Sequence, residues 1–241
     1  MNPPDATMSP IASPPQRTRI KICGLTREED LDAAVNAGAD AIGFVLYPRS
    51  QRYVSAARAG ALAQRLPPFV SPVLLFVNAT PGEVDEALDA VPGASLQFHG
   101  DETPEQCQAA SRGGRVPYLR AARVPLGPAA ALPDLVKFAA DFAQARGLLL
   151  DAHVEGYGGG GKTFDWSLLP PSVDAHLVLS GGLTPANVED GIAALRPRGK
   201  SLAVDVSSGV EVSKGIKDAR KIHQFIAAVR QADARISHSS S

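Results

Sequence analysis

Three residues that can exchange protons stand at or near the ends of short apolar runs in this chain of 241 residues. Cys23 closes one run, Asp151 closes a second, and Asp205 lies one residue before the end of a third. A carboxylic acid and a thiol held at one site can protonate one atom of a substrate and deprotonate another, which is general acid/base catalysis. These side chains can act together only if the fold brings the ends of the runs to one place.

The runs follow one repeated pattern, in which a short apolar segment is followed by a Ser, Thr or Asp and then by a stretch with helical spacing closed by Gly or Pro. This pattern is typical of βα units. Thr26 and Thr103 have Glu or Gln three residues later, as in a capping box, and Thr80 and Thr184 precede a Pro, so all four indicate helix starts. The eight runs that we expect to be strands are residues 19–23, 41–46, 73–77, 95–99, 116–121, 148–151, 177–180 and 202–206.

Eight βα units between residues 19 and 231 average about 27 residues each, which predicts a single (βα)8 TIM barrel of the phosphate-binding type. The alternative is a doubly wound open sheet. It is disfavoured because no Gly-x-Gly-x-x-Gly sequence follows the first run, where Lys-Ile-Cys-Gly stands instead. In a barrel, catalytic groups lie at the carboxyl ends of the strands, so Cys23, Asp151 and Asp205 would share one mouth.

The alternation of side chains along each run assigns them to the inside or the outside of the barrel. Ile20 and Ile22 are expected to face the helices, so Lys21 and Cys23 face inward. The same alternation places these residues inside: Ser95, Gln97, His99, Leu149, Asp151, Ala203 and Asp205. Branched aliphatic side chains usually fill a barrel interior, so this many polar groups near the mouth indicate a site. For any single one, the alternative of a hydrogen-bonded core residue stays open.

Small residues follow the last two expected strands. They are Gly181 and Gly182 after the seventh strand, and Ser207, Ser208 and Gly209 after the eighth. Backbone N–H groups can surround an anion where no Cβ intervenes, and these two loops form the common phosphate site of barrels. The alternative is a pair of ordinary glycine turns.

Residues 156–163, Gly-Tyr-Gly-Gly-Gly-Gly-Lys-Thr, match the consensus sequence of a nucleotide phosphate-binding loop. Such a loop must run directly into a helix, but Pro170 and Pro171 end the following stretch after about two turns. We therefore interpret the segment as a mobile loop over the barrel mouth.

The composition predicts a soluble, cytoplasmic protein. Lys and Arg total 24 and Asp and Glu total 25, a net charge of -1 that gives no general attraction to nucleic acid or to an anionic membrane. Two cysteines suit a reducing compartment, no apolar run approaches the roughly 20 residues of a membrane helix, and no His or Cys spacing indicates a metal site. Residues 1–18 predict a disordered proline-rich extension, with a transit peptide as the alternative, and residues 232–241 predict a flexible tail.

Seven motifs occur in order along residues 19–229. They are Lys-Ile-Cys-Gly at 21–24, Gly-Phe-Val-x-Tyr-Pro-x-Ser-x-Arg-Tyr at 43–53, Leu-Gln-Phe-His-Gly at 96–100, Leu-Leu-Asp at 149–151, Gly-Gly-Gly-Gly-Lys-Thr-Phe-Asp-Trp at 158–166, Leu-Ser-Gly-Gly-Leu at 179–183 and Asp-Val-Ser-Ser-Gly-Val-Glu at 205–211. Together they resemble the N-(5'-phosphoribosyl)anthranilate isomerases of tryptophan biosynthesis. The chain departs from that pattern at Phe98 and at residues 212–215, and the resemblance does not reach the proline-rich extension.

The resemblance implies an enzyme without a cofactor that performs an Amadori rearrangement of phosphoribosylanthranilate, from an aminoaldose to an aminoketose. By motif position, Asp151 is the general acid that protonates the ribose ring oxygen, and Cys23 is the general base that removes the proton from C2'. Arg52 matches the arginine that meets the anthranilate carboxylate, and Asp205 matches an aspartate at the substrate. The glycines and serines after the last two strands match phosphate ligands. Family members occur as monomers and as homodimers.

Three further residues are assigned less directly. Gln97 and His99 are candidates for substrate binding because they belong to a matched motif and face inward. Lys21 is our own inference, which the resemblance does not contain. It lies two residues before Cys23 on the same face, where its charge would lower the pKa of the thiol from about 8.5 toward about 7.

Two other functions stay open. A ring-closing indole-glycerol-phosphate enzyme would keep the barrel and the phosphate site but would need a buried catalytic Lys with Glu partners, whereas this chain offers Cys23 and Asp151. A sugar-phosphate sensor without catalysis would keep the fold and the anion site, and the presence of both proton-transfer groups weighs against it.

Overall fold

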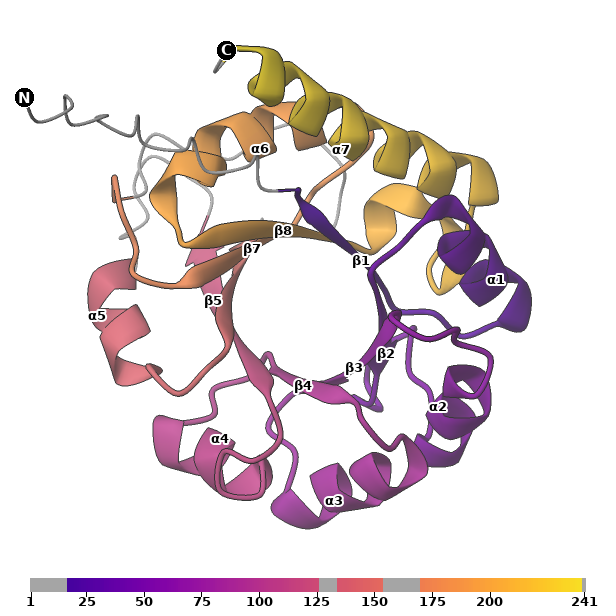
Figure 1. Cartoon of the computed structure of the whole chain (residues 1–241). Coiled ribbons are helices and arrows are strands. Elements are labelled where there is room, and N and C mark those ends of the chain that lie inside the picture. Colours follow the sequence, from indigo (N-terminus) through magenta and orange to yellow (C-terminus); the bar gives the residue numbers. More distant parts are fainter. Residues whose placement is uncertain (1–16, 126–133, 154–169, 240–241) are drawn as a thin grey trace, which may run out of the picture.

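The computed structural model describes residues 17–125, 134–153 and 170–239, and its elements form a ring of strands surrounded by helices (Figure 1). The eight strands of the ring are β1 (Arg19–Cys23), β2 (Ala41–Val45), β3 (Ser71–Phe76), β4 (Ser95–Phe98), β5 (Tyr118–Pro125), β6 (Gly147–His153), β7 (His176–Ser180) and β8 (Ser201–Val206). They pair in parallel in sequence order, and the pairing of β1 with β8 closes the barrel. The predicted strands and the predicted TIM barrel are confirmed.

Helices form the outer layer of the barrel. They are α1 (Glu28–Ala37), α2 (Ala56–Ala63), α3 (Pro81–Ala90), α4 (Pro104–Ala110), α5 (Leu135–Asp141), α6 (Val188–Leu195) and α7 (Ala219–Ser239). The long helix α7 contacts both α6 and α1, so it covers the seam between the first and last strands (Figure 1).

Short elements that the sequence analysis did not predict lie between α6 and α7. They are the 3-10 helices η2 (Arg196–Arg198) and η3 (Ser208–Val210), and an antiparallel hairpin of β9 (Glu211–Ser213) with β10 (Ile216–Lys217). The second 3-10 helix and the hairpin follow β8 directly, at the carboxyl end of the barrel.

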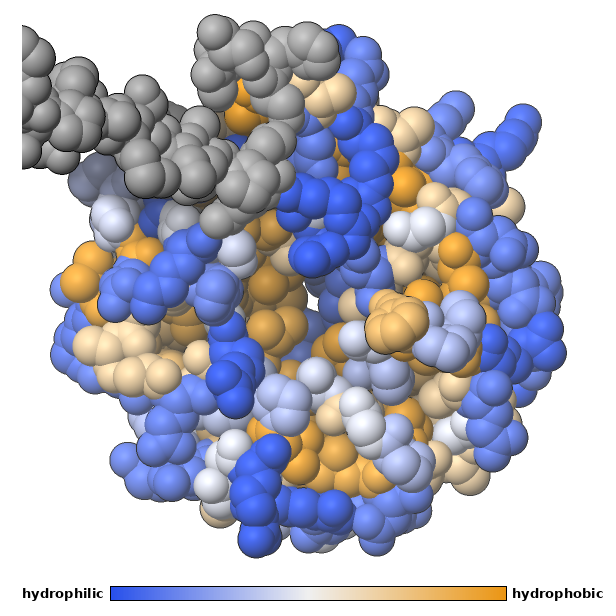
Figure 2. Space-filling view, in the orientation of Figure 1, coloured by the Kyte–Doolittle hydropathy of each residue, from blue (hydrophilic) through white to orange (hydrophobic). Residues whose placement is uncertain are grey.

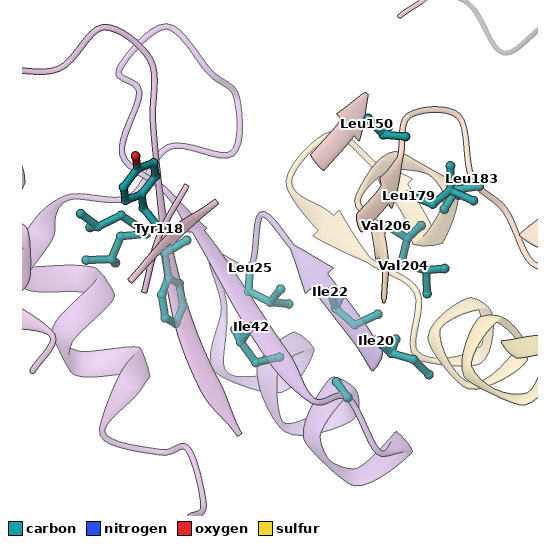
Figure 3. Packing of buried hydrophobic residues seen from close by; sticks show 14 of the residues in the cluster. Ile20, Ile22, Leu25, Ile42, Tyr118, Leu150, Leu179, Leu183, Val204 and Val206 are labelled. Atoms are coloured by element: carbon teal, nitrogen blue, oxygen red, sulfur yellow. The ribbon is translucent and has the colours of Figure 1, made fainter. Parts of the chain in front are cut away.

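Two apolar layers result from the alternation along the strands. In the outer layer, Ile20 and Ile22 of β1 stand opposite Val204 and Val206 of β8, and all four are buried in the core between the sheet and the helices (Figure 3). The inner layer is a small separate cluster made of Leu119, Ala121, Leu149, Val178 and Ala203. Figure 2 shows a hollow at the barrel axis, while hydrophilic side chains cover much of the surrounding surface.

Three threonines predicted to begin helices have different outcomes. Thr80 and Thr103 are N-caps with complete capping boxes, each accepting a hydrogen bond from the backbone N–H three residues later. Thr184 begins a turn instead, because its backbone N–H donates to Oδ1 of Asn187 and α6 starts only at Val188. The predicted helix start at Thr184 is therefore three residues too early.

The capping box predicted at Thr26 is wrong. Helix α1 begins at Glu28 after Arg27, whose side chain makes no capping hydrogen bond. The Thr26 hydroxyl donates instead to the backbone oxygen of Gly215 at 2.8 Å, in the turn of the β9–β10 hairpin. A contact to a residue far along the chain thus replaces the expected local one.

Ordered structure extends past both predicted limits of the barrel, which were residues 19 and 231. Thr18 is fully buried, and its backbone N–H and hydroxyl donate to the carboxylate of Asp233 at 2.9 and 2.6 Å. Helix α7 continues to Ser239, and Ala232 is buried in the core. Within the described ranges, no helix combines the length and the apolar character needed to cross a membrane.

Candidate active site

Cys23, Lys21 and Asp205 form a buried cluster inside the barrel. Closure of the barrel sets Lys21 of β1 opposite Asp205 of β8, and their Nζ and Oδ1 atoms lie 2.8 Å apart with both side chains about 5% exposed. Ser180, at the end of β7, donates its hydroxyl to the other oxygen of Asp205 at 3.0 Å. Gly43 of β2 provides the space, because a Cβ there would come within 2.7 Å of the Cys23 sulfur.

Burial and the two charges of this cluster act in different directions on the pKa of the Cys23 thiol. Burial raises the pKa of Cys23, the ammonium of Lys21 acts to lower it, and the carboxylate of Asp205 raises it again, so the pKa lies above its usual value. Burial alone would lower the pKa of Lys21, but Asp205 and Cys23 raise it, which keeps the ammonium charged. Lys21 lies where we inferred and acts on the thiol in the inferred direction, but burial outweighs it and Asp205 opposes it, so the pKa of Cys23 is raised and not brought toward neutrality.

Asp151, His99 and Gln97 form a second cluster across β4 and β6. His99 Nε2 lies 3.0 Å from Asp151 Oδ2, and His99 Nδ1 lies 3.0 Å from the amide nitrogen of Gln97. An amide nitrogen can only donate, so His99 Nδ1 accepts from Gln97 and Nε2 is the ring atom that faces Asp151. Gln97 is fully buried, and its Oε1 atom has no hydrogen-bond partner in this part of the structure. The predicted inward faces of β4 and β6 thus meet.

Arg52 lies on the loop after β2, with its side chain about a quarter exposed. Its Nε and Nη2 atoms donate to the two oxygens of Glu211, each at 2.7 Å, which is a bidentate pair. The side chain of Arg52 packs on Gly24, where a Cβ would come within 2.6 Å of the Arg52 Cδ. The resemblance assigned Arg52 to the substrate carboxylate, but its pairing with Glu211 was not predicted, because nothing local links residues 159 positions apart.

The loops after β7 and β8 touch each other, as a shared anion site requires. Gly181 and Gly182 both have left-handed φ angles, 79° and 64°, which favour glycine. Gly209 packs against the other loop so closely that a Cβ would collide with the backbone oxygen of Leu183. Ser207 precedes η3, and Ser208 begins it.

A metal site has no support in the parts of the chain that the structure describes, where no group of three or more His, Cys, Asp or Glu side chains could hold an ion. The glycine-rich segment 156–163, which we predicted to cover the mouth, lies outside the described residues.

Comparisons with known proteins give the family of this chain. The family model described as N-(5'phosphoribosyl)anthranilate (PRA) isomerase matches residues 20–228, which is nearly the whole barrel. The chain belongs to this family. The isomerase of Leptothrix cholodnii is 61% identical over 227 residues, covering 94% of this chain and 97% of that protein. The isomerase of Methylibium petroleiphilum is 62% identical over 223 residues, covering 92% and 99%.

Solved structures of PRA isomerases have the same fold. The enzyme of Thermotoga maritima superposes with a TM-score of 0.76 at 40% identity, covering 89% of this chain and 99% of that one. A PRA isomerase in complex with reduced 1-(o-carboxyphenylamino)-1-deoxyribulose 5-phosphate has a TM-score of 0.71 at 36% identity, covering 89% and 99%. Monomers generated from the dimeric Thermotoga maritima enzyme have a TM-score of 0.71 at 35% identity, covering 88% and 98%. Membership in the PRA isomerase family therefore rests on sequence and fold alike.

Proposed function

We propose that the chain converts N-(5'-phosphoribosyl)anthranilate into 1-(2-carboxyphenylamino)-1-deoxyribulose 5-phosphate, a step of tryptophan biosynthesis. Relatives with that activity in their names are 61% and 62% identical over nearly their full lengths. The position of Cys23 at the end of β1 and of Asp151 near the end of β6, at the mouth where barrel enzymes act, also supports the proposal. This placement of a thiol and a carboxyl at one mouth carries the proposal.

Asp151 is the proposed general acid. Its proton passes to the ribose ring oxygen, the bond from that oxygen to C1' breaks, and the anthranilate nitrogen supplies the electrons that form an iminium. His99 is a positioning residue for this step because its ring nitrogen holds one oxygen of Asp151 at 3.0 Å. Gln97, buried behind it, fixes the orientation of the imidazole.

Cys23 is the proposed general base. Its thiolate removes the proton from C2', which leaves an enolamine that becomes the ketone when C1' gains a proton and the C2' hydroxyl loses one. Burial raises the pKa of Cys23, so the thiol must lose its proton before turnover and then acts as a strong base. No cofactor takes part in this scheme, because one acid and one base complete it.

The remaining site residues are proposed to hold the substrate. Arg52 would bind the anthranilate carboxylate, for which a planar guanidinium is suited. Asp205, fixed by Lys21 and Ser180, would hold the amine or a ribose hydroxyl. The phosphate would bind to backbone and hydroxyl donors of the two loops after β7 and β8, at Gly181, Gly182, Ser207, Ser208 and Gly209.

Growth of a tryptophan auxotroph that lacks the isomerase tests this function. The full-length chain is expected to restore growth without tryptophan. Failure to restore growth despite soluble expression would contradict the proposal and favour a sugar-phosphate sensor. An assay of anthranilate fluorescence with each substrate distinguishes the isomerase from the ring-closing enzyme of the same pathway.

The chain is proposed to act in the cytoplasm as a monomer or a homodimer, and one region of its surface favours the homodimer. Phe69, in the loop between α2 and β3, is completely exposed and has a φ of 72°, which is costly for a large side chain. A cavity of about 410 Å³, lined by residues that include Leu66, Pro72 and Val91, opens beside that loop at the amino ends of the strands. Two copies could therefore exchange Phe69 side chains reciprocally, as in a twofold interface. A dimeric enzyme among the relatives supports this proposal.

A further inference from the structure

A buried charged network joins the two regions that are proposed to hold the anionic ends of the substrate. Glu211 accepts both hydrogen bonds from Arg52 and a third from Nζ of Lys217 at 2.8 Å. The same ammonium donates to the backbone oxygen and the hydroxyl of Ser207, both at 3.2 Å. The network therefore runs without a break from the loop after β2 to the loop after β8.

The carboxylate of Glu211 is the centre of this network. Its side chain is 5% exposed and that of Lys217 is completely buried. Each charged group has therefore lost its contact with water and is stabilised by its ion pair with the other. Burial acts to raise the pKa of Glu211, but Arg52 and Lys217 together hold it below its usual value. Glu211 is thus ionised and cannot leave either partner without a large cost.

The hairpin of β9 and β10 holds Glu211 and Lys217 in register across its two strands. The turn of the hairpin is itself fixed from three sides. The Gly215 N–H donates to Glu211 at 3.3 Å, its backbone oxygen accepts from Thr26, and a Cβ on it would come within 2.9 Å of the backbone oxygen of Gln51. The hairpin is therefore packed against the loops after β1 and β2 and supports them together with the loop after β8.

We propose that Glu211 is a positioning residue that fixes Arg52 for the substrate carboxylate and, through Lys217, fixes Ser207 for the substrate phosphate. This inference rests on the proposed function, because it assigns those two ends of the substrate to Arg52 and Ser207. One buried carboxylate then sets the separation of the two anion sites. It selects substrates that carry a carboxylate and a phosphate at the distance found in phosphoribosylanthranilate.

Two ligands that differ only in the carboxylate test the inference. One is the reduced product analogue, and the other is the same compound with an unsubstituted phenyl ring. The ratio of their dissociation constants reports the carboxylate contact alone, and competition by inorganic phosphate reports the other end. A general loss of structure would weaken both analogues alike and leave the ratio unchanged.

Three variants are expected to give three different patterns. Glu211→Gln lowers the preference for the carboxylate analogue by about tenfold or more, since Arg52, the donor to the ligand carboxylate, is no longer held in place. The same variant also weakens phosphate binding. Lys217→Met weakens phosphate binding but keeps the carboxylate preference, because Glu211 still holds Arg52. Glu102→Gln, a control at a carboxylate that is 6% exposed and accepts from the backbone N–H of Asn78 and Gly100, changes neither.

Glu211→Gln leaves Lys217 without its counter-ion, so its fold is checked by thermal unfolding. If that variant does not fold, the double variant Glu211→Gln, Lys217→Met removes both buried charges and is expected to show both losses. Retention of the carboxylate preference in every folded variant of Glu211 would overturn the inference. A wild-type protein that does not distinguish the two analogues would overturn the proposed function itself.

Discussion

The ammonium of Lys21 and the carboxylate of Asp205 form an ion pair inside the barrel, beside the Cys23 thiol. The pair exists because the strand that begins the barrel hydrogen-bonds to the strand that ends it, with these two residues directly opposite. Each residue acts on the thiol in the opposite sense. Lys21 favours the thiolate, and Asp205 disfavours it.

Lys21→Met is expected to move the ascending limb of the pH dependence of kcat/KM to higher pH. Cys23 acts as a base only after it loses its proton, so activity rises through its pKa. Burial already raises that pKa, and removal of the opposing ammonium raises it further. At neutral pH, kcat/KM should fall by about tenfold or more and should recover partly in alkaline buffer.

Ultraviolet absorbance of the thiolate, with a Cys23→Ser sample as the baseline, measures the same shift without substrate. Lys200→Met is the matched control, because Lys200 forms an exposed ion pair with Asp174 at 2.8 Å. An ascending limb that stays in place or moves to lower pH in Lys21→Met would show that Lys21 does not act on the thiol.

His99→Ala is expected to lower kcat by about 10-fold to 100-fold with little change in KM. The imidazole holds one oxygen of Asp151, and a misplaced general acid transfers its proton less often. Steady-state kinetics of the variant give both constants. His223→Ala on the exposed surface of α7 serves as the control. An unchanged kcat, or an effect seen only in KM, would show that His99 does not position Asp151.

Gly209→Ala is expected to weaken binding of inorganic phosphate and to lower the free energy of unfolding by about 1–3 kcal/mol. Its Cβ would collide with the backbone oxygen of Leu183, so the two loops must separate. Gly82→Ala in α3 has open space around the new methyl group and should raise the free energy of unfolding by about 0.5–1 kcal/mol. Urea unfolding and phosphate competition measure both effects. Wild-type phosphate affinity in Gly209→Ala would place the anion elsewhere.

Phe69→Asp is expected to convert a homodimer into a monomer that keeps its fold. A charge at a buried apolar contact opposes association, while in the single chain the same position is fully exposed. Light scattering coupled to size-exclusion chromatography gives the mass of each form. Val136→Asp, at a residue of α5 that is 56% exposed, should leave the mass unchanged. A wild-type protein with the mass of one chain would contradict the dimer.

Local patterns predicted the barrel because the strand and the helix of each βα unit are marked by residues within that unit. The alternation of Ile20 and Ile22 with Lys21 and Cys23 defines β1 to the residue, since one face must meet helices and the other the interior. Thr80 and Thr103 cap their helices with partners three residues away, so their role is readable from the sequence. Such signals extend over one turn or one strand.

Contacts between distant residues were not predictable in the same way. Thr26 has the spacing of a capping box, but its hydroxyl binds the backbone of Gly215 instead. Glu211 was visible only as the last residue of a motif, and its bond to Arg52 depends on the hairpin that follows β8. The pKa of Cys23 likewise depends on Asp205, which only barrel closure brings to it.

Turnover of Cys23→Ser and Asp151→Asn at saturating substrate tests most directly whether these two residues transfer the protons. Each variant is expected to lose about 100-fold to 10,000-fold in kcat, because each removes one proton-transfer group from the transition state. Each should still bind the reduced product analogue with nearly the wild-type dissociation constant. A kcat near that of the wild type in both variants would contradict the assignment of Cys23 as base and Asp151 as acid.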